Sequence, residues 1–330
     1  MPMLDKLFEG ANSEPELAVT LLGTGSVLPE IKRFGPSTLV RAGRQTFLFD
    51  FGRGLTIRLA QIGIHPSTID ANFLTHFHSD HTVGLPDVWL TAMVPAIDGS
   101  GIGRKTAMNL IGPKGTAILA AGLKQAYAAD VAIRCACDGT PLSGTDLNVT
   151  EFQGDGVVYE ADGVVVTAFT VDHGHEAIRP AVGFRVDYKG RSAVLSGDTR
   201  YCDNLVRAAR GADILVHEIM MAPDRALKVP GSRVPRVLTY HTNPEAAGRV
   251  FSQVLPKVAV YTHLILPGGG GSPPPTLDSL IAATRATYGG PVVAGADLDR
   301  IVSRADGVFV QHFDAAAQRY DTEIPALHFA

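Results

Sequence analysis

Short apolar runs separated by polar turns recur along most of the chain. The runs at 17–22, 37–42 and 45–49 are rich in Leu, Val, Phe and Thr, which favour strands. The first run ends in a Gly-Thr-Gly-Ser turn, where glycine permits a positive φ. Further strands are predicted at 71–74, 106–111, 148–152, 157–160, 164–169, 181–188, 192–195, 214–216 and 258–261, and near Val292.

Helical patterns alternate with these strands and indicate an α/β fold. Pro244 stands at the first turn of one of them, where its missing N–H is tolerated. After the strand near Val292 we expect an irregular tail in which His312 and His328 are structural. The predicted helices are 56–62, 85–93, 116–129, 204–210, 244–254 and 277–288.

The composition is that of an ordinary folded enzyme. Hydrophobic residues make up 45% of the 330 positions and charged residues 19%, and the formal net charge is −4. Nucleic acids and anionic membranes are bound by basic surfaces, and this charge balance shows no basic excess for either, although a local basic patch could lie within the total.

The cysteines give no sign of a disulfide framework, because Cys135, Cys137 and Cys202 are few and odd in number. Cys135 and Cys137 fall in a predicted strand, and we interpret them as strand residues rather than metal ligands. No apolar leader begins the sequence, and no stretch is apolar for long enough to span a bilayer. We expect a cytoplasmic protein, or a periplasmic or secreted one if a leader has been removed.

The densest group of chemically active residues is the stretch 75–81, Thr-His-Phe-His-Ser-Asp-His, which directly follows a predicted strand. If the chain stays extended, its two-residue period places His76, His78 and Asp80 on one side. The turn into the next helix can bring His81 to the same centre. Imidazoles with a carboxylate suit zinc or a similar metal, whereas the alternative is a polar loop that caps a helix.

His173, Asp198 and His263 each stand where a predicted strand ends, and such strand ends share one edge of an α/β sheet. With the ligands of 76–81 they are too many for one tetrahedral ion but suit two. His175 could replace His173 as a metal ligand, but we favour His173. One ion would take His76, His78 and His173, the other would take Asp80, His81 and His263, and Asp198 would bridge them.

This ligand pattern, with Leu-Leu-Gly-Thr-Gly-Ser at 21–26 and Phe-Asp-Phe-Gly at 49–52, resembles the metallo-β-lactamase superfamily. The resemblance implies an αββα sandwich of two mixed β-sheets flanked by helices, with a dinuclear metal site at the sheet edge. It covers residues 18–300 as one hydrolase domain, after an N-terminal arm at 1–17. Residues 301–330 are expected as a C-terminal extension packed on the same domain. The implied cofactors are two zinc ions, or manganese or iron in their place.

Within the superfamily, Gly84-Leu85-Pro86, His217-Glu218 and Tyr240-His241-Thr242 resemble the ribonuclease Z and arylsulfatase-like branch. The resemblance implies that a metal-bridging hydroxide is the nucleophile. It also implies that His241, oriented by Glu218, protonates the leaving group. The alternative for His241 and Glu218 is a buried hydrogen-bonded pair without a catalytic role.

Other residues are expected to support this chemistry. Asp80 is expected to orient the nucleophile as well as to bind metal. Asp50 either caps a strand end or accepts a hydrogen bond from a ligand imidazole, and His217 is expected beside it near the ligands. Trp89 belongs either to the core or to an aromatic pocket wall, and Lys32 and Arg33 are either solvated or anion-binding. The candidate substrate-binding residues are Lys32, Arg33, Arg200, Trp89 and His175.

The chain departs from ribonuclease Z between His173 and Asp198. The family has a long tRNA-gripping arm there, whereas this sequence has a short hairpin at Lys189-Gly190. Lacking both the arm and a basic surplus, the chain is expected to hydrolyse small anionic phosphodiesters or sulfate esters, as an arylsulfatase-like homodimer with no nucleic-acid or membrane partner. The alternatives are tRNA 3′ processing by an armless ribonuclease Z, a lactonase-type hydrolase, and a metal-stabilised binding protein whose His241-Glu218 pair lies out of reach of the metals.

Overall fold

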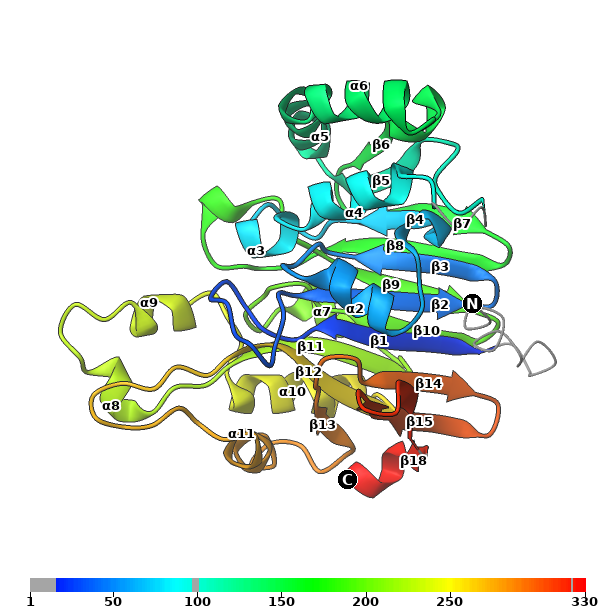
Figure 1. Ribbon diagram of the computed structural model, residues 1–330. Coiled ribbons are helices and arrows are strands. Elements are labelled where there is room, and N and C mark those ends of the chain that lie inside the picture. The colour runs from blue at the N-terminus through cyan, green and yellow to red at the C-terminus, as the bar shows by residue number, and fades with distance from the viewer. Residues whose placement is uncertain (1–15, 97–100, 322) are drawn as a thin grey trace.

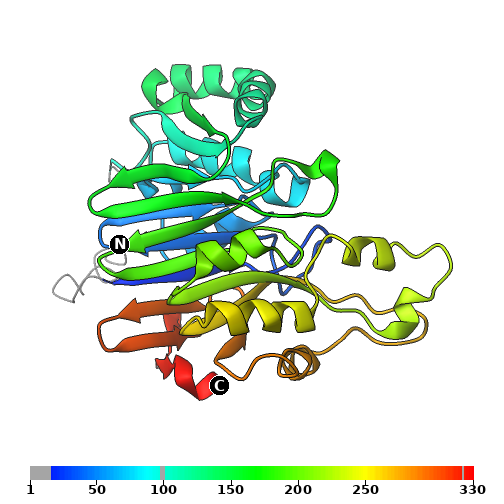
Figure 2. The same ribbon diagram turned by 180° about the vertical axis from the view of Figure 1, so that it is seen from behind.

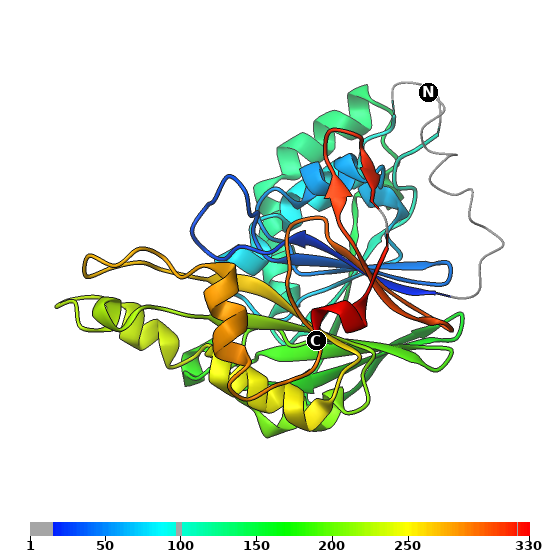
Figure 3. The same ribbon diagram turned by 90° about the horizontal axis from the view of Figure 1, so that it is seen from below.

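The computed structural model describes residues 16–96, 101–321 and 323–330. Two β-sheets lie face to face with helices on both outer faces (Figure 1, Figure 3). In spatial order, the first sheet contains β18 (Ile324–Pro325), β15 (Gly307–Gln311), β14 (Arg300–Arg304), β1 (Leu17–Gly23), β2 (Ser37–Ala42), β3 (Gln45–Phe49), β4 (Ala71–Phe73), β5 (Met108–Pro113) and β6 (Leu147–Phe152). The second contains β13 (Val292–Ala294), β12 (Val258–Ile265), β11 (Ile214–Met220), β10 (Arg191–Leu195), β9 (Val182–Tyr188), β8 (Val164–Thr170) and β7 (Gly156–Ala161).

Both sheets are mixed. In the first, β3, β4, β5 and β6 run parallel, whereas β1, β2 and β3 are antiparallel neighbours. In the second, β10, β11, β12 and β13 run parallel, and β7 to β10 are antiparallel. The carboxyl ends of the parallel strands therefore meet at one edge, which is where residues following β10, β11 and β12 converge.

An apolar layer fills the space between the sheets. On β9, the alternate residues Val182, Phe184 and Val186 are buried in this layer, as the two-residue strand period requires. From the first sheet, Phe49 and Phe73 stack with ring centroids 4.7 Å apart and both contact Phe184. The predicted αββα sandwich is confirmed.

Helices cover the outer face of each sheet. The first sheet packs against α2 (Leu55–Gln61), α4 (Leu85–Met93) and α5 (Thr116–Ala126), which is followed by α6 (Ala128–Cys137). The second packs against α7 (Asp203–Ala209), α10 (Pro244–Val254) and α11 (Leu277–Thr284) (Figure 2). Shorter elements are α3 (Ser79–Thr82), α8 (Asp224–Leu227), α9 (Val234–Leu238), the hairpin of β16 (Phe313–Asp314) and β17 (Arg319–Tyr320), and 3-10 turns at Pro66–Thr68, Leu142–Thr145, Glu176–Ile178 and Ala326–Phe329.

Helix α10 shows how local sequence sets these elements. The Asn243 side chain accepts a hydrogen bond from the Ala246 N–H and caps the first turn, where Pro244 needs no partner. Val250, Phe251 and Val254 share one face and are buried against the second sheet.

Most predicted strands and helices are confirmed within a few residues, but two expectations are wrong. Cys135 and Cys137 lie in α6 rather than in a strand, because helical periodicity continues past residue 129. The expected irregular tail instead supplies β14, which pairs with β1, together with β15 and β18. Most of the predicted 1–17 arm lies outside the described residues, and β1 begins at Leu17.

The segment 222–240, which carries α8 and α9, extends away from the sheets beside the stretch that leads to α11 (Figure 1, Figure 3). In the described part of the chain, no helix has the length and apolar character that a bilayer span requires.

Candidate metal centre

The stretch that follows β4 is held extended by Asp50. The carboxylate of Asp50 accepts hydrogen bonds from the backbone N–H of Thr75 and from its hydroxyl, both at 2.8 Å. The chain then turns into α3, which begins at Ser79 and contains Asp80 and His81. This path brings the four predicted ligands of 76–81 to the edge where the strands of the second sheet end.

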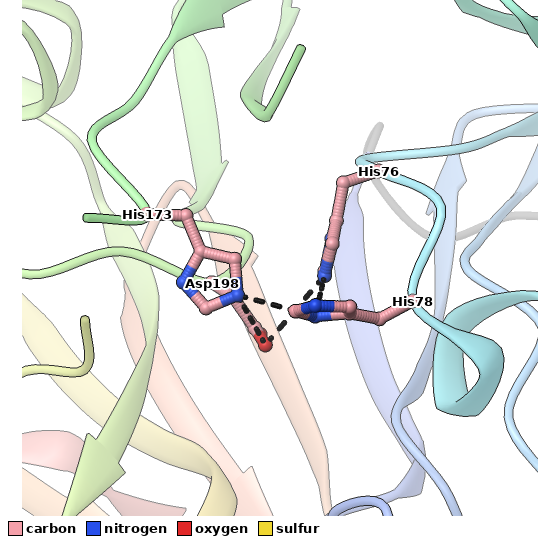
Figure 4. Close-up of side chains that lie close together, drawn as sticks. All are labelled: His76, His78, His173 and Asp198. Atoms are coloured by element: carbon pink, nitrogen blue, oxygen red, sulfur yellow. Dashed lines mark hydrogen bonds and ion pairs between the residues drawn. The ribbon is translucent and has the colours of Figure 1, made fainter. Parts of the chain in front are cut away.

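His76, His78, His173 and Asp198 form the first ligand group (Figure 4). The Nε2 atom of His76 lies 2.9 Å from the Nδ1 atom of His78, and the Nε2 atom of His173 lies 3.3 Å from the same Nδ1. The Oδ2 atom of Asp198 lies 3.8 Å from the His76 Nε2 and 3.6 Å from the His173 Nε2. The four donor atoms thus surround one point.

Asp80, His81 and His263 form the second group. The Nε2 atom of His263 lies 3.2 Å from the Oδ2 of Asp80, and the Nε2 of His81 lies 3.9 Å from the same oxygen. The Oδ2 of Asp198 is 3.3 Å from both imidazole Nε2 atoms. Asp198 therefore stands between the two groups, as a bridging carboxylate would.

These separations fit bound metal. Donor atoms about 2.1 Å from a tetrahedral zinc ion lie roughly 3.4 Å from one another, which is the range observed here. Within the described residues, the buried Nε2 of His81 has no hydrogen-bond partner, so a ligand-type nitrogen is left for an ion. The residues present accordingly fit a two-metal site.

The protonation states of the first group also suit metal binding, because a ligand imidazole must be neutral. Burial lowers the pKa of His173 to about 4 and lowers the pKa of His76 well below its usual value. In the second group, burial lowers the pKa of His81, but Asp198 and Asp50 outweigh it and raise that pKa well above normal. Metal must therefore compete with a proton at His81.

The rings of His81 and His173 are each oriented by a contact at the nitrogen that faces away from the metals. The Nδ1 of His81 lies 2.7 Å from the carboxylate of Asp50, and the Nδ1 of His173 lies 2.8 Å from the Tyr240 carbonyl oxygen, to which it donates. These contacts fix which nitrogen faces the metals. Of the two roles predicted for Asp50, the structure favours the one beside a ligand imidazole.

The backbone at His263 and Asp50 is unusual. Both are non-glycine residues with left-handed φ, 46° and 59°. The register between β11 and β12 shifts after Glu218, next to His263. Such an irregularity re-aims side chains at a strand end, and here it accompanies the approach of His263 to Asp80 and Asp198.

His241 and Glu218 lie beside the ligands. The Nδ1 of His241 is 3.2 Å from the Oε2 of Glu218, whose Oε1 accepts hydrogen bonds from the backbone of Thr199 and Thr242. The His241 ring centroid is 5.0 Å from that of His173. The pair therefore reaches the metal site, contrary to what a binding protein without turnover predicts.

Burial dominates the electrostatics of this pair. It lowers the pKa of His241 to about 4. Burial and then the nearby Asp198 raise the pKa of Glu218 well above its usual value. These shifts favour a protonated Glu218 beside a neutral His241, although the geometry at Oε2 and Nδ1 forms no hydrogen bond among the described residues. His241 also lines a cavity.

That cavity has a volume of about 480 Å³ and opens over both ligand groups. His78, Asp80, Asp198 and His263 contribute to its floor, and His241 lines it too. Apolar side chains supply much of the remaining wall, including Val27, Leu28, Val234, Val237 and Ile265.

Comparison with known proteins agrees with this geometry. Residues 46–264 match the Beta-lactamase superfamily domain. The chain belongs to the beta-lactamase superfamily. It is 35% identical to a ribonuclease Z of Mycobacterium marinum over 285 residues, which cover 86% of this chain and 98% of the relative.

Solved structures show the same fold. A metallo-beta-lactamase fold protein, YhfI from Bacillus subtilis, matches with a TM-score of 0.66 at 18% identity and covers 87% of this chain and 100% of its own. The short form of human tRNase Z matches with a TM-score of 0.60 at 21% identity and covers 87% of this chain and 98% of its own. As a member of this superfamily, the chain is a metal-dependent hydrolase of ester bonds.

We expected a small anionic ester as the substrate and no nucleic-acid partner. This expectation is wrong, because the relatives that the chain matches are named ribonuclease Z. The error has a physical source. Net charge sums over the whole surface and does not report whether cations gather beside the active site.

Two of the predicted substrate contacts have other roles in the structure. Arg33 donates from Nη1 to the Thr24 hydroxyl and the Gly295 carbonyl, so it braces two loops. Trp89 is 1% exposed and donates its indole N–H to the Thr145 carbonyl, which makes it a core residue.

The remaining candidates lie outside the cavity lining. Arg200 is paired with Asp172 at 2.9 Å. His175 is exposed and caps the 3-10 turn that follows it, by accepting from the Ala177 N–H. Lys32 is exposed on the loop next to the lining residues Val27 and Leu28.

His217 is corrected as well. Its Nδ1 lies 2.5 Å from the Glu218 carbonyl oxygen, and its ring packs against Phe251 of α10. Neighbouring residues on a strand face opposite sides, so Glu218 faces the metals and His217 cannot.

Sequence reasoning missed the residues that α9 brings to the cavity. Arg233, Val234 and Val237 line it, and Tyr240 both lines it and holds His173. Their only signal in sequence was the proximity of Tyr240 to His241.

Proposed function

We propose that this protein is a ribonuclease Z, an endoribonuclease that removes the 3′ trailer of precursor tRNA. The observation that carries the proposal is the near end-to-end similarity to a curated ribonuclease Z. The two ligand groups, with His241 and Glu218 beside them, supply the chemistry that hydrolysis of a phosphodiester requires.

The proposed ligands are His76, His78 and His173 for one zinc ion and Asp80, His81 and His263 for the other, with Asp198 shared. Zinc bound there would polarise a phosphate oxygen and lower the pKa of a water molecule. Manganese or iron in place of zinc would leave the roles of the protein residues unchanged.

The side chains divide the remaining work. The Asp80 carboxylate, at the cavity floor, accepts a hydrogen bond from the attacking water and orients it toward phosphorus. As the new P–O bond forms and the bond to the ribose oxygen breaks, His241 gives a proton to that leaving oxygen. Glu218 Oε2 lies 3.2 Å from the His241 Nδ1, so we assign the role of donor to the opposite ring nitrogen.

A cleavage assay with a precursor tRNA that carries a 3′ trailer tests the proposal. Zinc-loaded protein should release one trailer and one tRNA by a single cut, and His241→Ala protein should cut far more slowly. Intact precursor, in the presence of metal-loaded protein that hydrolyses a small aryl phosphodiester, would overturn the assignment. A cytoplasmic location is part of this proposal, since it is where precursor tRNA would be met.

A further inference from the structure

The segment 222–240 is locally basic although the chain as a whole is acidic. It carries Arg225, Lys228, Arg233 and Arg236 against one carboxylate, Asp224. All four cations are exposed, and none forms an ion pair within the parts of the chain that the structure describes. Their positive charge is therefore not neutralised by the protein.

One end of this segment borders the active site. Arg233 lines the cavity that also contains His78, Asp80 and His241. Arg233 is the N-cap residue of α9, and Arg236 lies three residues later in that helix. Residues three apart on a helix are surface neighbours. Cations thus continue from the cavity wall onto the surface of the segment.

The other part of the segment, α8, is supported by the glycine-rich loop at 267–275. A Cβ on Gly270, whose φ is 60°, would lie 2.6 Å from the Arg225 carbonyl oxygen, and a Cβ on Gly269 would lie 3.0 Å from the Ala226 Cβ. Paired backbone hydrogen bonds between Gly269 and Ser272 close the loop. Only glycine lets this loop approach so closely, so α8 rests on a fixed support.

We propose that the segment 222–240 is the RNA-binding arm of this protein, and that it binds the phosphates of precursor tRNA through Arg225, Lys228, Arg233 and Arg236. The inference rests on the proposed ribonuclease function and adds where the RNA is held. Unpaired exposed cations next to a phosphodiesterase site suit a polyanion, because each phosphate contact releases counterions. Guanidinium groups add bidentate contacts to phosphate.

The test replaces the three cations that do not line the cavity, in the variant R225Q/K228Q/R236Q. The control, R44Q/K105Q/K189Q, removes the same charge from exposed loops at the opposite end of the strands. Both variants are compared with the wild-type holoenzyme for kcat/KM on precursor tRNA over a series of salt concentrations. Zinc content and melting temperature report folding.

The arm variant should lose on the order of tenfold in kcat/KM near 0.1 M salt, and its log–log salt slope should be shallower by about 2, whereas the control should match wild type. Glutamate at the same three positions should weaken cleavage further. If the arm and control variants behave alike, the inference is wrong while the proposed function stands.

If wild-type protein leaves the precursor uncut, the proposed function fails instead. Fluorescence anisotropy with the same RNA then still tests the arm, which predicts tighter binding by wild type and control than by the arm variant. Loss of binding to anionic lipid vesicles in the arm variant, with RNA binding unchanged, would overturn the inference and assign the cations to a membrane surface.

Discussion

His241 and Glu218 lie 3.2 Å apart between Nδ1 and Oε2. His241 belongs to neither predicted ligand set, although it also lies within ligand distance of Asp198 and His263. His241→Ala should therefore lower kcat on precursor tRNA by about 10²–10⁴-fold while the zinc content stays constant. Glu218→Gln should cause a smaller loss, since the ring keeps a neighbour. The matched control is Glu245→Gln, an exposed glutamate that pairs with Arg249. If the His241→Ala protein lost as much zinc as a variant of a predicted ligand such as His173→Ala, His241 would be a ligand instead.

Asp50 holds the ligand loop through Thr75 and the ligand ring through His81. Asp50→Asn should weaken zinc binding by about 10–100-fold, because His81 loses the partner that fixes its orientation and basicity. Competition with a chromogenic chelator measures this affinity. Asp70→Asn changes a carboxylate that accepts a hydrogen bond from the Thr46 N–H, and unchanged affinity is expected there.

Metal removal should both stop cleavage and destabilise the fold. Ligands that bind only the folded state raise stability by mass action, so chelation should lower the melting temperature and zinc should restore it. Elemental analysis should find about two ions in wild type and about one in His173→Ala. Retention of both ions by His173→Ala would contradict the proposed division of ligands. The control is His65→Ala, in the turn before the 3-10 helix at 66–68, and it should retain both ions.

His217 predicts a pH dependence of stability. Burial lowers its pKa from 6.5 to about 4, so the unfolded chain binds its proton more readily than the folded one. This histidine thus costs no stability above about pH 6.5 and lowers stability as pH falls toward 4. The measurement uses metal-free protein, kept so by a chelator. Between about pH 4 and 6.5, the free energy of unfolding should change less steeply with pH in His217→Phe than in wild type, by at most about 1.4 kcal/mol per pH unit. Identical slopes would contradict the buried, uncharged state of the ring.

Much of the metal site was predictable from sequence because its signals are local. His76 and His78 lie in the extended stretch after β4, and Asp80 and His81 follow at once in α3. Asp198 and His263 stand at strand ends that parallel pairing brings together, and His173 follows β8, which joins them through antiparallel β9. The sandwich followed from the family that these motifs resemble, not from the strand pattern alone.

The rest depended on tertiary packing. His217 and Glu218 are adjacent in sequence, yet only one can face the metals, and the sequence does not say which. Arg33 and Trp89 carry groups suited to a substrate, but loops and helices that fold back from distant parts of the chain engage them first. Arg233 became visible only once α9 was placed against the cavity.

The ligands come from both halves of the sandwich. His76 to His81 follow β4 of the first sheet, whereas His173 and Asp198 follow strands of the second and His263 lies in its strand β12. Metal bound there would link the two sheets, because each sheet supplies part of the ligands. No chain with only one sheet formed can gain the free energy of full coordination, since half of the donors are absent. Metal loading is thereby reserved for molecules whose sheets have already docked, so that catalytic competence and completed folding arrive together.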